Sequence, residues 1–94
     1  MRFRLSGRAK ADIRRALAYI SARNPRAALG WKADLDVAFD KLGRNPGLGA
    51  TRFERRANLR LLPVGRYVVL YLHDGGDAVV LRVPHGSQDW WMLV

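Results

Sequence analysis

The stretch LRLLPVGRYVVLYLHDGGDAVVLRV, residues 59–83, decides the fold of this chain. It contains three apolar runs separated by turn residues, at 59–64, 67–73 and 78–83. Gly75 and Gly76 stand between the last two runs, and a Gly-Gly pair permits the positive φ angles of a two-residue hairpin. The stretch therefore predicts three strands in an antiparallel meander.

A turn at Gly75-Gly76 also predicts which strand residues face each other, beginning with Asp74 opposite Asp77. Counting outward places six apolar residues on one side of the sheet: Leu72, Leu70, Val68, Val79, Leu81 and Val83. Because this side is wholly apolar, we expect it to carry the helices. The other side then holds Tyr67, Val69, Tyr71, Val80 and Arg82. Such a mixed face suits contact with a partner, or is simply the solvated side of an antiparallel sheet.

Upstream of the strands, helical spacing of apolar residues predicts two helices with almost no linker between them. The first covers residues 8–23 and buries Ile13, Ala16, Leu17 and Ile20. Asn24 followed by Pro25 is a typical helix start, and Gly43 is expected to cap the end of the second helix, just before Pro46. The second helix is expected to bury Ala28, Trp31, Leu35, Ala38, Phe39 and Leu42.

Residues 2–5 alternate polar and apolar and predict a first strand, with Ser6 capping the helix that follows. Residues 44–58, rich in Gly and Arg, predict a loop. The expected fold is one α+β domain over residues 1–94. Its order is a strand, an antiparallel two-helix hairpin and a three-stranded antiparallel meander, with the helices on one face of the sheet.

Composition points to an anionic partner. The 94 residues include 17 Lys and Arg against 8 Asp and Glu, a formal net charge of +9. Most of the cations are arginine, whose planar donor fork suits phosphate and carboxylate. There is no cysteine, no apolar segment long enough to cross a membrane and no secretory signal at the start, so we expect a cytoplasmic protein.

Residues that could bind a ligand or take part in catalysis gather near one end of the predicted meander. The same register places Arg66 opposite His85, and Arg60 and Arg82 complete a possible basic cluster. The alternative interpretation is that His85 is an exposed loop histidine without a functional role. His73 is not positioned to join it, so we expect no metal site and no cofactor. No serine or threonine lies in a nucleophile motif.

Two segments in this order of elements, LRLLPVGRYVVLY (59–71) and VVLRVPHGSQDW (79–90), resemble the ParE branch of the RelE/ParE toxin superfamily. The segments SGRAKADIRRALAYI (6–20) and LGRNPGLG (42–49) are also similar to that family, so the resemblance covers residues 3–90. It implies the toxin of a type II toxin–antitoxin, or plasmid stabilisation, system. It further implies inhibition of DNA gyrase by binding, and neutralisation by an acidic ParD-like antitoxin in a hetero-oligomer.

The RelE branch of the superfamily instead cleaves mRNA on the ribosome, using basic residues on the second and third strands. Here Val68, Leu59 and Leu61 stand where those residues are expected. Because loss of such charge-stabilising groups is disabling, this favours a binding inhibitor over an enzyme. Two alternatives remain: a ribosome-dependent endoribonuclease that uses Arg66, Arg82 and His85, and a non-toxic descendant that only binds its antitoxin.

The apolar end of the chain includes Trp90 and Trp91, which either fold back onto the domain or dock a partner. No catalytic residue is assigned. The candidates for binding the target or the antitoxin are Arg60, Arg66, Tyr67, Tyr71, Arg82, His85, Trp90 and Trp91.

Overall fold

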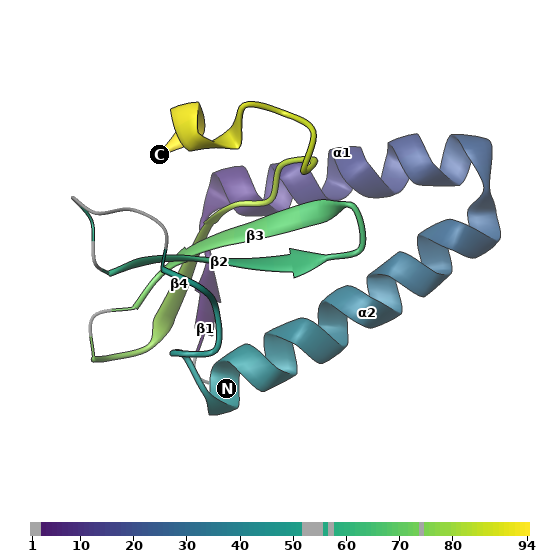
Figure 1. Cartoon of the computed structure of the whole chain (residues 1–94). Helices are drawn as coiled ribbons and strands as arrows, with labels where there is room; N and C mark the ends of the chain where they lie inside the picture. The colour runs from purple at the N-terminus through teal and green to yellow at the C-terminus, as the bar shows by residue number, and fades with distance from the viewer. Residues whose placement is uncertain (1–2, 52–55, 57, 74) are drawn as a thin grey trace.

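The computed structural model describes residues 3–51, 56, 58–73 and 75–94. Its elements in chain order are β1 (Phe3–Leu5), α1 (Gly7–Arg23), α2 (Pro25–Arg44), β2 (Leu59–Val64), β3 (Tyr67–Leu72), β4 (Ala78–Arg82) and a short 3-10 helix, η1 (Trp90–Leu93). The predicted α+β order, helical hairpin and meander are confirmed (Figure 1). The predicted place of Asp74 in the turn lies outside the described residues.

Side-chain caps define the helical hairpin. The Ser6 hydroxyl accepts a hydrogen bond from the Ala9 N–H at 3.0 Å and donates one to the Leu81 carbonyl at 2.7 Å, which ties the start of α1 to β4. Asn24 ends α1 through its backbone N–H and begins α2 through its side chain, which accepts from the Ala27 N–H. One residue therefore turns the chain.

The predicted end of the second helix was wrong. Gly43 lies inside α2 and is buried, and the helix continues to Arg44. The C-cap is Asn45, whose N–H donates to the Lys41 carbonyl at 2.8 Å. Because Gly43 does not adopt a positive φ angle, it cannot terminate the helix as a left-handed glycine would.

The sheet has the strand order β1-β4-β3-β2. The three later strands form the predicted antiparallel meander, and β1 adds to β4 in parallel. The sheet is therefore mixed and four-stranded, and α1 serves as part of the crossover that a parallel pair requires.

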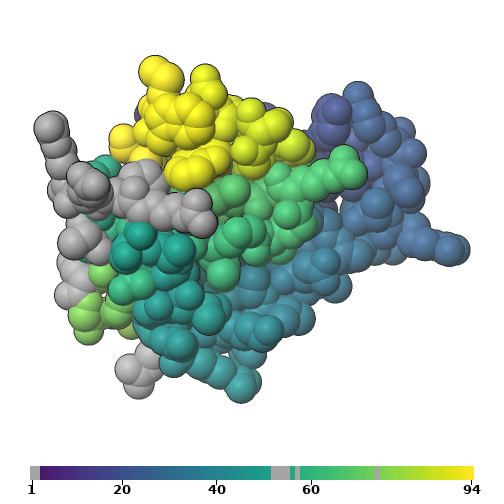
Figure 2. All heavy atoms as spheres, viewed as in Figure 1, coloured from purple at the N-terminus to yellow at the C-terminus, as the bar shows by residue number. Residues whose placement is uncertain are grey.

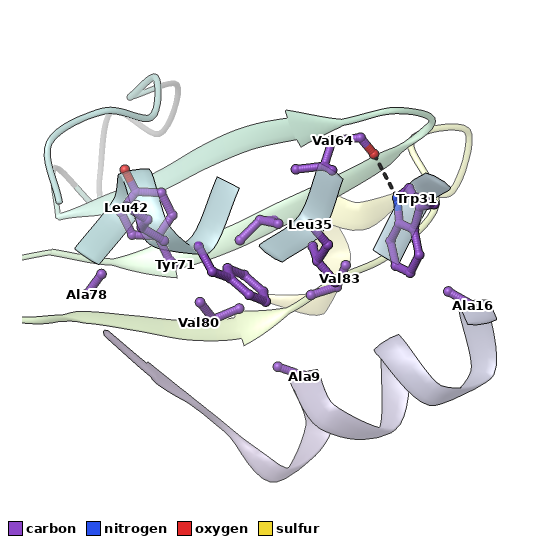
Figure 3. Close-up of a cluster of buried hydrophobic side chains, with 12 residues drawn as sticks. Ala9, Ala16, Trp31, Leu35, Leu42, Val64, Tyr71, Ala78, Val80 and Val83 are labelled. Carbon is purple, nitrogen blue, oxygen red and sulfur yellow. Dashed lines mark hydrogen bonds between the residues drawn. The ribbon is translucent and has the colours of Figure 1, made fainter. Parts of the chain in front are cut away.

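The predicted assignment of sheet faces was wrong. Val69, Tyr71 and Val80 lie on the face covered by the helices, where they pack with Trp31 and Leu35 (Figure 3). Alternation could not distinguish the faces, because β3 is apolar on both. A register shift between Leu70 and Tyr71 also pairs Leu70 with Arg82 instead of Leu81, so counting from the turn fails beyond that point.

The opposite face of the sheet is covered by the C-terminal segment. Leu61, Val68 and Leu70 form a second apolar cluster, against which Trp90 and Val94 pack. Figures 1 and 2 show this segment lying over the strands, on its own side of the sheet. Both faces are therefore shielded, one by the hairpin and the other by the tail. No helix in the described part of the chain is long and apolar enough to cross a membrane.

Leu35→Ala should lower the free energy of unfolding by about 2–5 kcal/mol, because it leaves a cavity between α2 and the sheet. Leu35 is only 1% exposed. The matched control is Leu29→Ala on the same helix, where the side chain is 74% exposed and a change within about 0.5 kcal/mol is expected. Denaturant unfolding followed by circular dichroism measures both. Equal losses of stability would contradict the burial of Leu35 between α2 and the sheet.

Candidate functional site

Two adjoining hollows, of about 310 and 500 Å³, lie beside the junction of α1 and α2. We call them together the hairpin-end groove. Tyr19, Tyr67 and His85 line both hollows. Four arginines line one hollow or the other: Arg15, Arg23, Arg66 and Arg82. The groove thus joins the end of α1, the β2–β3 turn and the segment after β4.

Aromatic contacts build the floor of this groove. The Tyr67 ring lies 4.8 Å from the Trp31 ring and 5.1 Å from the His85 ring, measured between centroids. The Trp31 indole N–H donates to the Val64 carbonyl at 3.1 Å, which fixes the indole beneath the turn (Figure 3). Burial and the neighbouring Tyr19 raise the pKa of Tyr67, so its hydroxyl remains a neutral hydrogen-bond donor at physiological pH.

The segment after β4 continues beside the start of β3. His85 forms a bridge with Tyr67, and the Gly86 N–H donates to the Arg66 carbonyl at 2.7 Å. The expected pairing of Arg66 with His85 was therefore wrong by one residue, which is the displacement that the shift at Leu70 introduces. Arg66 and His85 nevertheless line the same hollow.

Arg82 is held by a buried carboxylate and was wrongly placed on an open face. The Asp12 carboxylate accepts from Arg82 Nε at 2.8 Å and from the Val83 N–H at 2.9 Å. Arg15 donates to the same carboxylate at 2.6 Å. Burial alone would raise the pKa of Asp12, but the hydrogen bonds from Arg82 and Val83 outweigh it and hold the pKa below its usual range.

A sequence signal for this ion pair existed. Asp12 stands between Ala9 and Ala16 on the apolar stripe of α1. A lone acid on a buried helix face is expected to have a cationic partner. The partner itself could not be predicted from local sequence, because Arg82 is 70 residues away.

Arg60 and Tyr71 lie outside the groove and secure the loop after α2. Arg60 donates to the carbonyls of Gly47 and Gly49, at 3.1 and 2.7 Å. The Tyr71 hydroxyl donates to the Pro46 carbonyl and accepts from the Gly49 N–H. Burial raises the pKa of Tyr71. Both residues were predicted as binding candidates. Tyr71 is instead fully buried beneath the helices, and both side chains stabilise the loop after α2.

The two tail tryptophans differ in exposure. Trp90 is half-buried against the face of the sheet opposite the helices, so the tail folds back onto the domain. Trp91 is 56% exposed, with its ring centroid 5.6 Å from that of Trp90. Met92 beside it is 76% exposed, so this end of the tail keeps an apolar surface.

The groove is suited to gripping anionic groups. Asp12 already binds two of its guanidinium groups, those of Arg15 and Arg82, so Arg23 and Arg66 are the cations left to contact an anion. His85 Nδ1 accepts the Ser87 N–H at 3.0 Å. Leu59, Leu61 and Val68, which the resemblance places at the basic positions of the RelE branch, have buried side chains. No group of His, Cys, Asp or Glu within the described ranges is arranged to hold a metal ion.

The described chain is a helical hairpin over one face of a small mixed sheet, with a basic groove at the end of the hairpin. A structure described as the chromosomal ParDE TA system from P. aeruginosa matches it with a TM-score of 0.73 at 19% sequence identity. The match covers 90% of this chain and 95% of that chain.

Residues 3–90 also match the family of the ParE toxin of the type II toxin–antitoxin system parDE. The chain belongs to this family. No curated protein sequence matches it significantly. The resemblance on which the sequence interpretation rested is thereby confirmed.

Proposed function

We propose that this ParE-family toxin inhibits DNA gyrase by binding it, and that an acidic ParD-like antitoxin neutralises it in the cytoplasm. The observation that carries the proposal is the family match over residues 3–90. The site supports binding without chemistry of its own, since Leu59, Leu61 and Val68 leave no cation at the positions where the RelE branch needs one. The net charge of +9 favours rapid encounter with an acidic antitoxin.

Among the candidate residues, we propose Arg66 and His85 in the groove as the principal target contacts. Arg66 is exposed on the β2–β3 turn, and His85 is half-buried with its ring against that of Tyr67. Arginine and aromatic side chains together are typical of residues that dominate binding energy at protein interfaces. Trp91 is a second candidate contact, on the separate surface that the tail presents.

A gyrase supercoiling assay with purified toxin tests the proposal. Wild-type toxin should inhibit supercoiling, and Arg66→Ala should raise the half-inhibitory concentration by about tenfold, as expected for an interface hot spot. Arg44→Ala is the control, because Arg44 lies at the far end of α2 from the groove and its side chain is 80% exposed. Normal supercoiling at toxin concentrations that stop growth would reject gyrase as the target.

One observation keeps a ribonuclease in consideration, namely that His85 and Arg66 line the same hollow. A general base beside a cation is the minimum that metal-free RNA cleavage requires. Primer extension on translated mRNA after toxin induction should give an uncut profile if gyrase is the target. Discrete cuts would favour the ribonuclease, and normal growth on induction would favour a chain that only binds its antitoxin.

A further inference from the structure

The outward side of α2, which runs along the border of the molecule in Figure 1, carries an exposed apolar stripe. Leu29 is 74% exposed and Val37 is 54% exposed, and the exposed Ala33 stands halfway between them. A step of four residues advances only about 40° around a helix, so the three side chains lie within about 80° of one another. Trp31 and Leu35, which belong to the core cluster, point about 160° away from Ala33. We call Leu29, Ala33 and Val37 the α2 stripe.

The stripe continues into residues of opposite charge at its two ends. Arg26 precedes Ala33 by seven residues and Asp40 follows it by seven, and seven residues complete two helical turns to within about 20°. Both charged residues are exposed, and Asp40 forms a surface ion pair with Arg44 at 3.3 Å. Because exposed pairs within one helix are weak, Asp40 is available to a second cation.

We propose that the α2 stripe binds the same stripe of a second copy of this chain, with the two helices antiparallel and the two-fold axis at Ala33. In that register Leu29 lies level with Val37 of the partner subunit. Arg26 lies level with Asp40 of the partner subunit. Each contact occurs twice, because a two-fold interface pairs its residues reciprocally. Ala33 meets its own copy at the crossing, where a small side chain lets the two helix axes approach.

The charges beside the stripe are compatible with this register. Lys32 and Asp36 lie on one side of the stripe and form an ion pair at 2.7 Å within their own helix. The antiparallel contact brings two such pairs together, so this side holds two lysines and two aspartates with no net charge. Asp34 on the other side approaches its own copy. Its side chain points about 100° away from Ala33, where water and salt screen the repulsion.

The same charges favour a second copy over an acidic partner. Helix α2 has four cationic residues less three acidic ones, a net charge of +1, whereas the whole chain has +9. An acidic segment, such as that of the proposed antitoxin, would therefore meet three of the eight acids of the chain on this helix. The hairpin-end groove, which four arginines line, is the better site for such a segment.

The antiparallel contact leaves both hairpin-end grooves open. Asn24 and Ala27 line the groove at the start of α2, and no residue of the α2 stripe lines it. Since the two copies run in opposite directions, their grooves lie at opposite ends of a helix pair that is about 30 Å long for 20 residues. The inference goes beyond the proposed function: the dimer presents two target sites, whatever the target is.

Sedimentation equilibrium of the purified toxin tests the contact. One helix pair buries less than the roughly 1,200 Å² of a standard interface, so the mass should rise toward that of a dimer only at sub-millimolar concentrations. Ala33→Arg places two like charges at the crossing and should raise the dimer Kd by at least about tenfold. The matched control is Ala22→Arg, at an exposed alanine of α1, which should keep the wild-type Kd. Thermal melts establish that both variants fold.

Charge reversal tests the register. Arg26→Glu sets two acids against each other at both ends of the contact, and Asp40→Arg does the same with two arginines. Each variant should raise the dimer Kd by about tenfold. The double variant Arg26→Glu/Asp40→Arg restores both ion pairs and keeps the wild-type net charge, so it should return the Kd to within about threefold of wild type. These exposed positions also serve if Ala33→Arg does not fold.

Four results would overturn the proposal. A monomeric mass throughout the sub-millimolar range would exclude the dimer. Equal dissociation in Ala22→Arg and Ala33→Arg would mean that total charge, not the α2 stripe, controls association. No recovery in the double variant would reject the antiparallel register. An unchanged mass in Ala33→Arg, together with weaker binding of the acidic antitoxin, would assign the stripe to that partner. Because no gyrase is present, these outcomes are independent of the supercoiling assay.

Discussion

Asp12→Ala should lower the free energy of unfolding by about 3–5 kcal/mol, because it leaves the largely buried Arg82 guanidinium without its counter-ion. The Asp12 side chain is only 6% exposed, and it also accepts the Val83 N–H. Unfolding in guanidinium chloride, followed by circular dichroism, measures the loss of stability. Arg15→Ala is the control, since that side chain is 70% exposed and an exposed pair contributes at most about 1 kcal/mol.

The same ion pair changes the expectation for Arg82. From the sequence, Arg82→Ala should reduce toxicity more than folding, because Arg82 is assigned to an open face. With Arg82 bound to Asp12, the substitution instead removes a partner of a buried carboxylate. Stability and toxicity should therefore fall together. A variant with wild-type stability and no toxicity would restore a direct role for Arg82 in binding the target.

Asp12 also predicts how stability depends on pH. Its pKa in the folded protein is depressed below the usual range, so the folded state releases this proton more readily than the unfolded state does. The resulting stabilisation is complete above the unfolded pKa of about 4 and is lost as the pH falls through the folded pKa. Unfolding free energies measured between pH 7 and pH 2 should decline in this acidic window. Asp12→Asn should remove that part of the decline; an unchanged profile would exclude Asp12 as its source.

Tyr71→Ala should lower the free energy of unfolding by about 3–5 kcal/mol, as for other large buried aromatic residues. The side chain is fully buried between the helices and the sheet (Figure 3). Denaturant unfolding again measures the effect. A smaller loss of stability, below about 2 kcal/mol, would mean that the helices close over the vacated space.

Tyr71→Phe separates the hydroxyl from the ring. It leaves the Gly49 N–H and the Pro46 carbonyl without their partner, which should cost about 1–3 kcal/mol. Hydrogen exchange at the Gly49 amide is the specific readout, and it should accelerate in Tyr71→Phe. Unchanged exchange would show that the Arg60 contacts alone hold this loop.

The sequence by itself determined the elements and their order. Helical spacing, the Ser6 and Asn24 caps, Pro25 and the Gly75-Gly76 turn are local signals, and each acts within a few residues of where it stands. The family motif depends on the same segments. These features were predictable because local backbone preferences and short-range hydrogen bonds produce them.

Only the tertiary structure decided which face of the sheet the helices cover and which of the candidate side chains stabilise the fold. Both faces of β3 are apolar, so the choice depended on packing: Tyr71 went under the helices while Trp90 covered Leu70 on the other side. The shift at Leu70 then moved every pairing beyond it by one residue. Arg82 binds Asp12, which is 70 residues away in the sequence, and local sequence patterns do not predict so remote a contact.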